Sequence, residues 1–589
     1  MCGIVSVLGQ NVSQYIKLGL KQLQNRGYDS IGFSIINKKQ FYTKKYTNAY
    51  NDPIKLLNNE IIPETYNGIG HTRWATHGSI TIENTHPHKS YDNKIMLVHN
   101  GIIENYEELK NMLIQKNITF YSDTDTEVIP NLISYYYRDN TIHDSILLTT
   151  NDLHGTWALC IQCIDYPDTI YCIKNKNPLL IGYNNESCII TSELNGFLNH
   201  IPHYINIIDS DLITIKYNSS ITIISNYNYP LINNTFQESS LNGEKHWTIK
   251  EIKDQKNIIN QILNENIIIN DSIVEIVPLT KYYEILKNID HIILLSCGSS
   301  YFSSQIGRNF LKKNKNINTI QVFDGADFSI HDIPKKGQTI FIFVSQSGET
   351  MDLIKCVNII NNYFKIGIIN NKTSTLSKLM NANIFCNIGR ENAVASTKSF
   401  TSQVIILSLL SIYLDHLLNN KTNINIINDL HLLKEQLNYT INNYQYESLN
   451  INQNCFILGR DNDEYIAKET ALKMKEINYI HAEGYSSSVL KHGPLALITE
   501  NFTVILINSD PSHFKKNKNI YNEIISRNGN VITITSQPNI PNSIYVETNN
   551  SYQCIINIIN IQMLIYNLSL KLNINPDKPR NLAKVVTVE

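Results

Sequence analysis

The stretch Thr339-Ile-Phe-Ile-Phe-Val-Ser-Gln-Ser-Gly-Glu-Thr350 joins an apolar, strand-forming run to a loop that is rich in hydroxyl groups. A buried strand that ends in such a loop and continues into a helix is the repeating unit of parallel, doubly wound sheets. The segment His291–Leu295, followed by Ser296-Cys-Gly-Ser-Ser-Tyr301, repeats the pattern. This part of the chain is therefore predicted to be an α/β domain.

The same pattern returns towards the C-terminus. Cys455–Leu458, Phe502–Ile507 and Val531–Thr535 are further candidates for buried strands. The second copy has Asn508-Ser-Asp-Pro511 where the first has its Ser345–Thr350 loop, so two copies of shared ancestry would have divided their tasks. The predicted α/β subdomains cover residues 282–422 and 446–579.

The first part of the chain has a different organisation, with many short β-rich runs and helical runs near 12–25 and 104–116. Such a pattern is typical of a layered α+β domain with stacked antiparallel sheets. We expect this domain at residues 2–238, a polar linker at 239–248 and a C-terminal tail at 580–589. The expected strands are Ile4–Leu8, Gly32–Ile36, Ile95–His99, Trp157–Ile164, Ser187–Thr191, Leu212–Ile215 and Ile221–Ile224.

The composition is that of a globular protein, with 42% hydrophobic residues, 17% charged residues and a net charge of −2. No long basic run favours nucleic acid or an anionic membrane. We find no secretory signal and no apolar stretch that predicts a membrane span. The scattered cysteines suit reduced thiols in a cytoplasm, and Cys160-x-x-Cys163 lacks the second pair that a metal site would need. Neither a metal nor a cofactor is predicted.

The chain begins Met1-Cys2-Gly3-Ile4-Val5. Methionine is usually removed before a small residue, which would leave Cys2 with a thiol and a free α-amine. The amine titrates near ~8 and the thiol near ~8.5, so the amine can act as the general base of its own residue. A cysteine at this position can also be an accident of sequence, so the first five residues alone do not establish a nucleophile.

The Ser345–Thr350 loop can surround an oxyanion with hydroxyl and backbone N–H groups at the start of a helix. Ordinary helix capping is the alternative, because Ser or Thr near a Glu is common at helix N-termini. Three hydroxyl groups in six residues exceed what a cap needs, and Ser299 and Ser300 would add donors from the neighbouring strand end. The loop lacks a Walker lysine and a GxGxxG pattern, so a small phosphorylated metabolite is favoured over a nucleotide.

Residues Glu464 to Ile477 read as a helix, on which Glu469, Lys473 and Glu476 share one face. An exposed salt-bridge ladder would have the same spacing. Lys491-His492-Gly493-Pro494 follows after a short loop and could converge with that face. A carboxylate, a lysine and a histidine together could open a sugar ring and move a proton.

The tail Pro579-Arg-Asn-Leu-Ala-Lys-Val-Val-Thr-Val-Glu589 has an apolar, β-prone end after Lys584. Chain termini are usually frayed, but an apolar end can also dock. A lysine in an enclosed pocket can have a lowered pKa and form a Schiff base with a keto sugar. Both interpretations of Lys584 remain open from the residues alone.

Taken together, these segments resemble the glutamine:fructose-6-phosphate amidotransferases (isomerising), over essentially the whole chain. Each motif alone is weak, and their number and order carry the resemblance. The matching stretches are MCGIV 1–5, RGYDS 26–30, HTRWATHG 71–78, HPH 86–88, HNGIIEN 99–105, TDTEV 124–128, CGSSY 297–301, SQSGET 345–350, VASTK 394–398, ALKMKEI 471–477, YIHAE 479–483, LKHGPLAL 490–497 and PRNLAK 579–584.

The resemblance implies an N-terminal-nucleophile glutaminase domain with αββα layers, followed by two doubly wound sugar-isomerase (SIS) subdomains with parallel sheets. In the first domain Cys2 would attack the glutamine carboxamide, and Asn100 and Gly101 would form the oxyanion hole. Arg73 would bind the substrate carboxylate, a natural bidentate match. The remaining glutamine-site residues would be Asp125 at the α-ammonium, Thr76 and His77 lining the pocket, and Trp74 at the entrance to an internal ammonia channel.

In the isomerase half, the resemblance implies that His492 assists ring opening and that Lys584 forms a Schiff base with fructose 6-phosphate. Glu476 would move the proton between C1 and C2, supported by Lys473 and Glu469. The residues implied at the sugar-phosphate site are Cys297, Gly298, Ser299, Ser300, Ser345, Gln346, Ser347, Thr350, Val394, Ala395 and Ser396. The resemblance further implies a homodimer formed through the SIS half, in which His492 would reach the partner's sugar site, and a product that would feed amino-sugar (UDP-N-acetylglucosamine) biosynthesis.

The chain departs from the family pattern at a few positions. Ser299 replaces Thr and keeps the hydroxyl, whereas Ser488-Val489 replaces Gly-Glu and removes a carboxylate close to the sugar site. Two alternatives to the full synthase are a sugar-phosphate sensor without turnover and an uncoupled glutaminase or transferase for another acceptor. A sensor would not need Cys2, Glu476, His492 and Lys584 together, so we expect a cytoplasmic, homodimeric enzyme that acts on glutamine and fructose 6-phosphate, without nucleic-acid or membrane partners.

Overall fold

The computed structural model describes residues 2–48, 52–75, 77–234, 240–264, 266–270, 273–443 and 451–584. The chain divides into two compact units. The first comprises the residues up to 239 together with the described tail residues 583–584, and the second comprises residues 240–582. Each unit is considered by itself below.

The first unit is built on two antiparallel sheets. The larger has the strand order β14-β11-β9-β10-β1-β4-β2-β3, and the smaller has the order β13-β12-β8-β7-β6-β5. The strands are β1 (Gly3–Gly9), β2 (Ser30–Asn37), β3 (Gln40–Thr47), β4 (Asn67–Arg73), β5 (His88–Lys89), β6 (Ile95–Ile103), β7 (Gly155–Cys163), β8 (Thr169–Asn175), β9 (Leu180–Tyr183), β10 (Ser187–Thr191), β11 (His203–Asn206), β12 (Ile213–Tyr217), β13 (Ile221–Ile224) and β14 (Ile232–Asn233).

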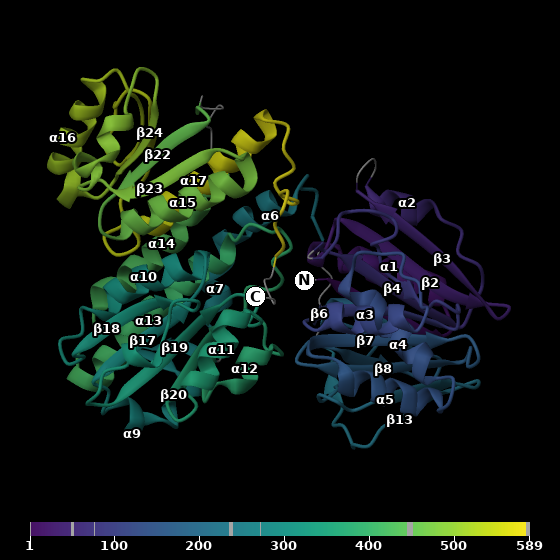
Figure 1. Cartoon of the computed structure of the whole chain (residues 1–589). Helices are drawn as coiled ribbons and strands as arrows, with labels where there is room; N and C mark the ends of the chain where they lie inside the picture. The colour runs from purple at the N-terminus through teal and green to yellow at the C-terminus, as the bar shows by residue number, and fades with distance from the viewer. Residues whose placement is uncertain are drawn as a thin grey trace. The chain divides into compact units, whose positions relative to one another are not determined.

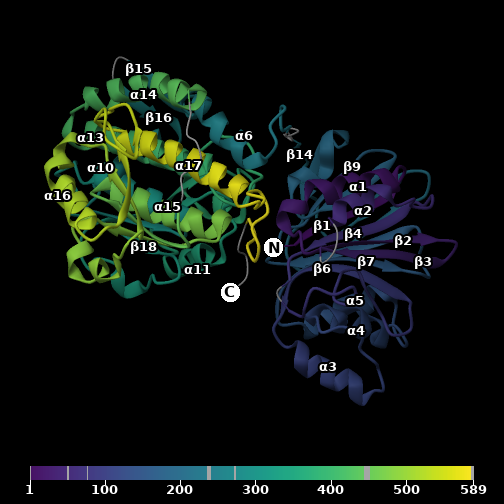
Figure 2. The ribbon, with the colours of Figure 1, turned by 90° about the horizontal axis from the view of Figure 1, so that it is seen from above.

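Helices cover the outer face of each sheet, which gives the αββα layers seen in Figure 2. The alternation of side chains along β1 explains this layering, because Ile4 and Leu8 point into the core between the sheets whereas Val5 and Val7 pack with Ile16 of α1. The helices are α1 (Val12–Gln22), α2 (Pro53–Asn59), α3 (Tyr106–Gln115), α4 (Val128–Tyr136) and α5 (Ile142–Asp152). The predicted stacked-sheet domain is therefore confirmed.

The second unit contains two five-stranded parallel sheets, ordered β18-β17-β19-β20-β21 and β23-β22-β24-β25-β26. Both have the doubly wound arrangement that the strand–loop–helix pattern predicted. The strands are β17 (His291–Ser296), β18 (Thr319–Asp324), β19 (Thr339–Ser345), β20 (Phe364–Ile369), β21 (Ala382–Phe385), β22 (Asn454–Gly459), β23 (His481–Ser486), β24 (Thr503–Asn508), β25 (Asn530–Thr535) and β26 (Ser543–Tyr545), besides a small hairpin of β15 (Ile267–Asn270) and β16 (Ile273–Ile276).

Both faces of each parallel sheet are buried against helices, which is why these strands are almost continuously apolar. Ile342 of β19 packs in the large core that both sheets share, whereas Phe341 and Phe343 pack with residues of α11. Figure 1 shows α11 beside this sheet. The helices are α6 (Trp247–Asp254), α7 (Ile258–Ile262), α8 (Val277–Thr280), α9 (Tyr283–Leu286), α10 (Ser299–Leu311), α11 (Met351–Ile359), α12 (Thr375–Leu379), α13 (Lys398–Asn419), α14 (Ile424–Asn442), α15 (Asn462–Asn478), α16 (Phe514–Ile525) and α17 (Gln553–Lys571).

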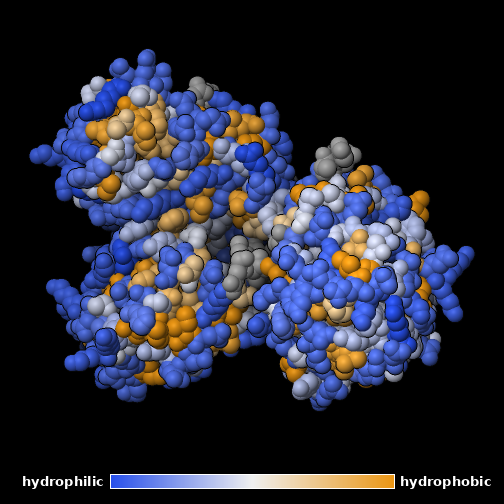
Figure 3. Space-filling model, in the orientation of Figure 1, coloured by the Kyte–Doolittle hydropathy of each residue, from blue (hydrophilic) through white to orange (hydrophobic). Residues whose placement is uncertain are grey.

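Two helices, α13 and α17, are long and apolar enough to cross a membrane by length and composition alone. The sequence had predicted no such stretch. In the structure 78% of the apolar window of α13 and 83% of that of α17 are buried inside the protein. On the face drawn in Figure 3, the surface is mostly hydrophilic, with scattered apolar patches.

Candidate functional site

Cys2 lies at the start of β1, in the first unit, where the neighbouring β4 ends. The Trp74 backbone N–H donates to Cys2 Sγ at 3.2 Å, and the thiol lies 3.5 Å from the Trp74 carbonyl oxygen. Burial raises the pKa of the Cys2 thiol, and the Trp74 N–H and the nearby Arg73 lower it in part. The thiol is thus held in a defined position and needs a base to become a nucleophile.

A pocket opens beside this thiol and contains most of the residues that the sequence assigned to glutamine. Trp74 and His77 line it together with Arg73, Asp125 and Gly101. Thr76 lies outside the described residues. Further lining residues that the sequence did not single out for this pocket are His86, His99, Thr124 and Thr126.

Arg73 is buried and its guanidinium is fixed by three backbone carbonyls. Nη2 donates to His77 O at 2.6 Å and to Gly78 O at 3.1 Å, and Nη1 donates to Ser79 O at 3.2 Å. Asp125 is buried as well and accepts the Ile103 backbone N–H at 2.8 Å. A fixed cation and a fixed carboxylate in one small pocket match the carboxylate and ammonium groups of an α-amino acid.

Asn100 and Gly101 follow one another on β6, next to Cys2. The Asn100 side chain donates from Nδ2 to the Cys2 carbonyl oxygen at 3.0 Å, and its backbone carbonyl accepts from Asn177 Nδ2 at 2.8 Å. Gly101 has φ of 141°, and a Cβ there would lie 1.9 Å from the Thr156 carbonyl oxygen. Only glycine fits that position, so the backbone geometry beside the thiol is strictly defined.

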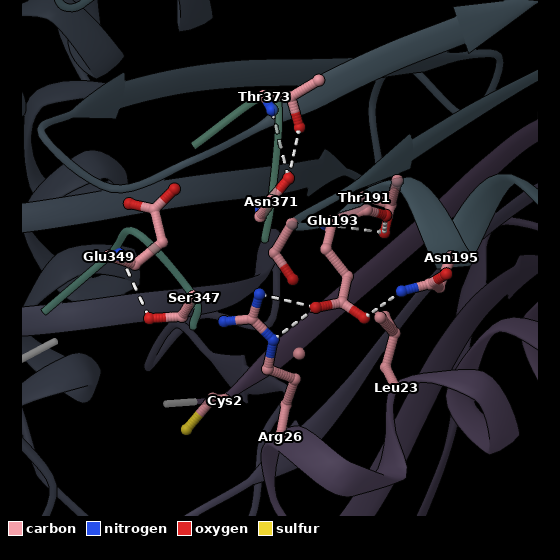
Figure 4. A network of polar contacts seen from close by, with 12 residues as sticks. Cys2, Leu23, Arg26, Thr191, Glu193, Asn195, Ser347, Glu349, Asn371 and Thr373 are labelled. Atoms are coloured by element: carbon pink, nitrogen blue, oxygen red, sulfur yellow. Dashed lines mark hydrogen bonds and ion pairs between the residues drawn. The ribbon is translucent and has the colours of Figure 1, made fainter. Parts of the chain in front are cut away.

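The RGYDS segment supports the Cys2 site, a role that the sequence alone did not indicate. Asp29 accepts the Ala75 N–H at 2.9 Å, and a Cβ on Gly27 would lie 2.5 Å from the Arg73 carbonyl carbon. Arg26 donates from Nε to Glu193 at 2.6 Å, and Asn195 donates to the same carboxylate at 2.7 Å (Figure 4). The contacts of Gly27 and Asp29 hold the backbone that carries Arg73 and Trp74.

In the second unit, the Ser345–Thr350 loop lies between β19 and α11, as predicted. Ser345 Oγ accepts the Gly348 N–H at 3.0 Å, and Ser347 Oγ accepts the Glu349 N–H at 3.2 Å (Figure 4). Thr350 flanks α11 without a side-chain capping bond. The hydroxyl groups thus order the turn, while Gln346, Ser347 and Thr350 remain half-buried.

The strand end next to this loop carries Cys297, Gly298, Ser299 and Ser300. The register pairs Ser296 with Val344, which places these residues beside the Ser345–Thr350 loop at the carboxyl edge of the sheet. Ligands of open α/β sheets bind at this edge, where the strand order reverses. Ser300 Oγ accepts from Gln403 Nε2 at 3.0 Å, so one hydroxyl of the set serves the α10–α13 contact.

The face of α15 that carries Glu469, Lys473 and Glu476 is buried. It is therefore not a solvent-exposed ladder of salt bridges. Ser299 Oγ donates to Glu469 Oε1 at 3.0 Å, and Lys473 Nζ lies 2.6 Å from Glu476 Oε2 and 3.6 Å from Glu469 Oε1. The side chains of Glu469 and Lys473 are 0% and 5% exposed, and that of Glu476 is 17% exposed. The structure thus joins a residue of the first parallel sheet's edge to a charged triad on a helix of the second.

Burial raises the pKa of Glu469 to about 7, although Lys473 and the Ser299 hydroxyl oppose the shift. Burial alone would lower the pKa of Lys473, but the carboxylates of Glu469 and Glu476 outweigh it and raise that pKa. Lys473 therefore remains a cation between two carboxyl groups, one of which titrates near neutrality. Such a pair of differently tuned groups suits proton transfer.

Val394, Ala395 and Ser396 lie in the segment before α13. Ser396 Oγ lies 2.7 Å from Ser399 Oγ, and Glu391 accepts the Thr397 and Ser399 N–H groups at 3.0 and 3.1 Å. The Glu391 charge also contributes to the raised pKa of Lys473. Glu391 is a residue that sequence reasoning missed, since nothing in its local pattern indicates that it folds back on the segment.

Two further predicted catalytic residues are His492 and Lys584, and Lys584 is the last residue that the structure describes. His492, in the short helix Leu490–His492, is exposed, and its side chain makes no hydrogen bond or ion pair within the described residues. Lys584 is half-buried and groups with the first unit. The apolar tail end after it lies outside the described residues.

The comparisons with known proteins identify the domains of the two units. The glutamine amidotransferase domain model matches residues 71–199, and the SIS domain model matches residues 285–413 and 449–571. The chain therefore combines a glutamine amidotransferase domain with two SIS domains. A domain from Francisella tularensis, described as the C-terminal domain of glucosamine-fructose-6-phosphate aminotransferase, aligns with a TM-score of 0.50 and 26% identity over 58% of this chain and 100% of its own.

Full-length relatives define the family more closely. A protein of Acanthamoeba polyphaga mimivirus named "Probable glutamine--fructose-6-phosphate aminotransferase [isomerizing]" is 39% identical over 100% of both chains. The glutamine--fructose-6-phosphate aminotransferase [isomerizing] of Caldanaerobacter subterraneus is 33% identical, again over 100% of both. The chain belongs to the family of glutamine–fructose-6-phosphate aminotransferases (isomerizing).

Proposed function

We propose that this chain transfers the amide nitrogen of glutamine to fructose 6-phosphate and isomerises the product to glucosamine 6-phosphate, with release of glutamate. The observation that carries the proposal is the presence, in one chain, of the Cys2 pocket and of the buried Ser299–Glu469–Lys473–Glu476 cluster beside the Ser345–Thr350 loop. A glutaminase alone would not need the second site, and a sugar-phosphate sensor would not need the first.

In the proposed first half-reaction, removal of Met1 exposes the α-amine of Cys2, which takes the thiol proton. The thiolate attacks the glutamine carboxamide carbon, and the amide nitrogen leaves as ammonia. Asn100 Nδ2 and the Gly101 N–H stabilise the oxyanion, an interaction generally worth about 3–4 kcal/mol per donor. Arg73 and Asp125 bind the α-carboxylate and α-ammonium, Trp74, Thr76 and His77 complete the pocket, and water then hydrolyses the thioester.

In the proposed second half-reaction, the phosphate binds the Ser345–Thr350 loop and the neighbouring strand end. The residues assigned to it are Cys297, Gly298, Ser299, Ser300, Ser345, Gln346, Ser347 and Thr350, with Val394, Ala395 and Ser396 along the sugar. His492 opens the ring and Lys584 forms a Schiff base at C2, which ammonia displaces. Glu476 carries the proton from C1 to C2, and Lys473 and Glu469 support that transfer.

Assembly and location extend the proposal. We assign the chain to the cytoplasm, since all ten cysteines are free thiols in the structure. We further propose a homodimer. His492 is exposed and lacks a side-chain partner among the described residues, so its side chain is available to contact a second copy of the chain. Size-exclusion chromatography with light scattering measures the mass of the protein in solution. A monomeric mass at the concentration used in the activity assay would contradict the dimer.

The decisive experiment incubates the Met1-processed full chain with glutamine and fructose 6-phosphate and measures glutamate and glucosamine 6-phosphate together. Equal yields are expected from the native chain and neither product from Cys2→Ala. Glu476→Gln should still release glutamate but form no amino sugar. Glutamate without amino sugar from the native chain would contradict the synthase and point to Ser488-Val489, and absence of both products would favour the sensor.

A further inference from the structure

A cluster of four buried histidines adjoins the Cys2 pocket, and two of them, His86 and His99, line it. His71, His86, His88 and His99 come from three different sequence motifs, and each is at most 5% exposed. His71 and His86 stack with ring centroids 4.0 Å apart. Among the described residues, no group of three His, Cys, Asp or Glu side chains is placed to hold a metal ion. The proposed mechanism uses none of these rings.

The protonation of His71 follows from its neighbours. Burial lowers the pKa of His71 to about 3, although the contacts with Asn100 and with the His99 carbonyl raise it in part, so the ring is neutral at pH 7. Its Nε2 lies 3.0 Å from the His99 carbonyl oxygen, which can only accept. Nε2 must therefore carry the proton, and Nδ1 has no hydrogen-bond partner among the described residues.

This tautomer determines how the Asn100 amide is turned. The same Nε2 lies 3.1 Å from the end of the Asn100 side chain, and an N–H donor there requires an oxygen opposite it. Oδ1 of Asn100 therefore faces His71, and Nδ2 faces Cys2, where it donates to the carbonyl oxygen at 3.0 Å. With the opposite turn, Oδ1 would face the developing oxyanion and repel it.

The contact also joins the two sheets of the first unit. His71 lies on β4, paired with Ile4 of β1, and Asn100 lies on β6 in the other sheet. We infer that His71 is a positioning residue for the oxyanion hole, whose Nε2–H donates to Asn100 Oδ1 and turns Nδ2 towards the reacting carbon. The inference rests on the proposed glutaminase half-reaction.

The expected kinetic signature separates this role from substrate binding. Arg73 and Asp125, which bind glutamine, do not depend on the turn of the Asn100 amide. Loss of the His71 donor should therefore lower kcat for glutamate release and leave KM for glutamine nearly unchanged. Since loss of an oxyanion donor costs about 10²–10³ in kcat, loss of its orientation should cost roughly tenfold or more.

The test compares glutamate release by the full native chain, His71→Leu, His71→Gln and His88→Leu. Leu cannot donate, whereas Gln Nε2 can take the place of the imidazole N–H. His71→Leu should lose kcat at constant KM, and His71→Gln should recover most of the loss. His88→Leu removes a buried histidine of the same cluster that does not contact Asn100, so its kcat should remain near that of the native chain.

The inference is overturned if His71→Leu keeps the native kcat, if its loss lies in KM, or if folded His71→Gln is no better than His71→Leu. Should the variants not fold, ¹⁵N-histidine spectra of the native chain decide: a neutral Nε2–H ring at pH 7 supports the inference, and a Nδ1–H ring or an imidazolium refutes it. A native chain that releases no glutamate instead refutes the proposed function, and the spectra still report the tautomer.

Discussion

At the residue scale, burial is what distinguishes the charged face of α15 from a surface ladder. Glu469, Lys473 and Glu476 have a spacing that is common on exposed helices. In the structure Lys473 is enclosed between the two carboxylates, and Ser299 from another subdomain completes the cluster. In a buried ion pair, each charge is stabilised by the other. Deleting one member strongly destabilises the fold, because the remaining charge is then buried without a partner.

Lys473→Met should therefore destabilise the second unit by about 3–5 kcal/mol at pH 8, because it leaves buried carboxylates without a cation. The loss should shrink below pH 7, since Glu469 can then take up a proton. Lys468→Met is the matched control on the same helix, because Lys468 is 36% exposed and pairs with Glu464 at i,i+4. It should cost less than about 1 kcal/mol in calorimetric or urea unfolding, and equal losses for both variants would contradict the prediction.

At the element scale, the turn between β19 and α11 depends on a close approach to α12. Gly348 has φ of 66°, and a Cβ there would lie 2.1 Å from Ser374 Oγ. Ser374 in turn caps α12 by accepting the Ser377 N–H at 3.3 Å. The proposed phosphate loop and the N-terminus of α12 are thus packed together, and the loop cannot shift without disturbing that cap.

We expect Gly348→Ala to raise KM for fructose 6-phosphate by about tenfold to a hundredfold, as displacement of binding groups by an ångström or so does elsewhere. Gly389→Ala is the matched control, since Gly389 has nearly the same φ of 67° but no atom within 4 Å of its Cβ. The Gly389→Ala variant should have only the strain of an alanine in the left-handed backbone conformation, about 1–2 kcal/mol. Its KM for fructose 6-phosphate should therefore be unchanged. Similar KM values for both alanine variants would show that the close approach to Ser374 is unimportant.

At the scale of the whole molecule, the stability of the two units should respond differently to acid, because burial lowers the pKa values of histidines in the first and raises those of carboxyl groups in the second. The pKa of His71 is about 3 in the fold and 6.5 as its ordinary value, and those of His86 and His88 are also lowered by burial. Below pH 6.5 the unfolded chain binds more protons than these buried rings, so the first unit loses stability as the pH falls. In the second unit, Asp463 and Glu469 have raised pKa values of about 7, so the folded state binds the extra protons below that pH.

Acidification from pH 7.5 to 5 should therefore lower the thermal transition of the first unit and spare that of the second. For each pH unit below 6.5, each fully buried histidine should lower the free energy of unfolding of the first unit by up to about 1.4 kcal/mol. Scanning calorimetry across this range measures the effect. Replacement of His88 by Leu should reduce the pH dependence of the first transition, and a second unit that unfolds first on acidification would contradict the assignment of these shifts.

The predicted elements lie where apolar periodicity is strong, and for that reason most were found from the sequence. The run Thr339–Val344 became β19 (Thr339–Ser345), and the helix expected from Glu464 to Ile477 became α15 (Asn462–Asn478). The sequence analysis identified no apolar stretch long enough to span a membrane, whereas α13 and α17 are long and apolar enough by composition. Both helices are mostly buried inside the protein, and burial in a protein core requires the same apolar composition as burial in a bilayer. The expected domain boundaries and catalytic roles remain predictions.

The sequence by itself determined the local chemistry: a cysteine that becomes terminal, a hydroxyl-rich loop after a buried strand, and a charged helix face. It did so because these features depend on residues close together in the chain. Only the tertiary structure decided that the helix face is buried against Ser299, that His71 lies within hydrogen-bond distance of Asn100, and that His492 is exposed. Those contacts join strands and helices far apart in sequence, and their burial, tautomers and pKa values come from packing, which no local pattern contains.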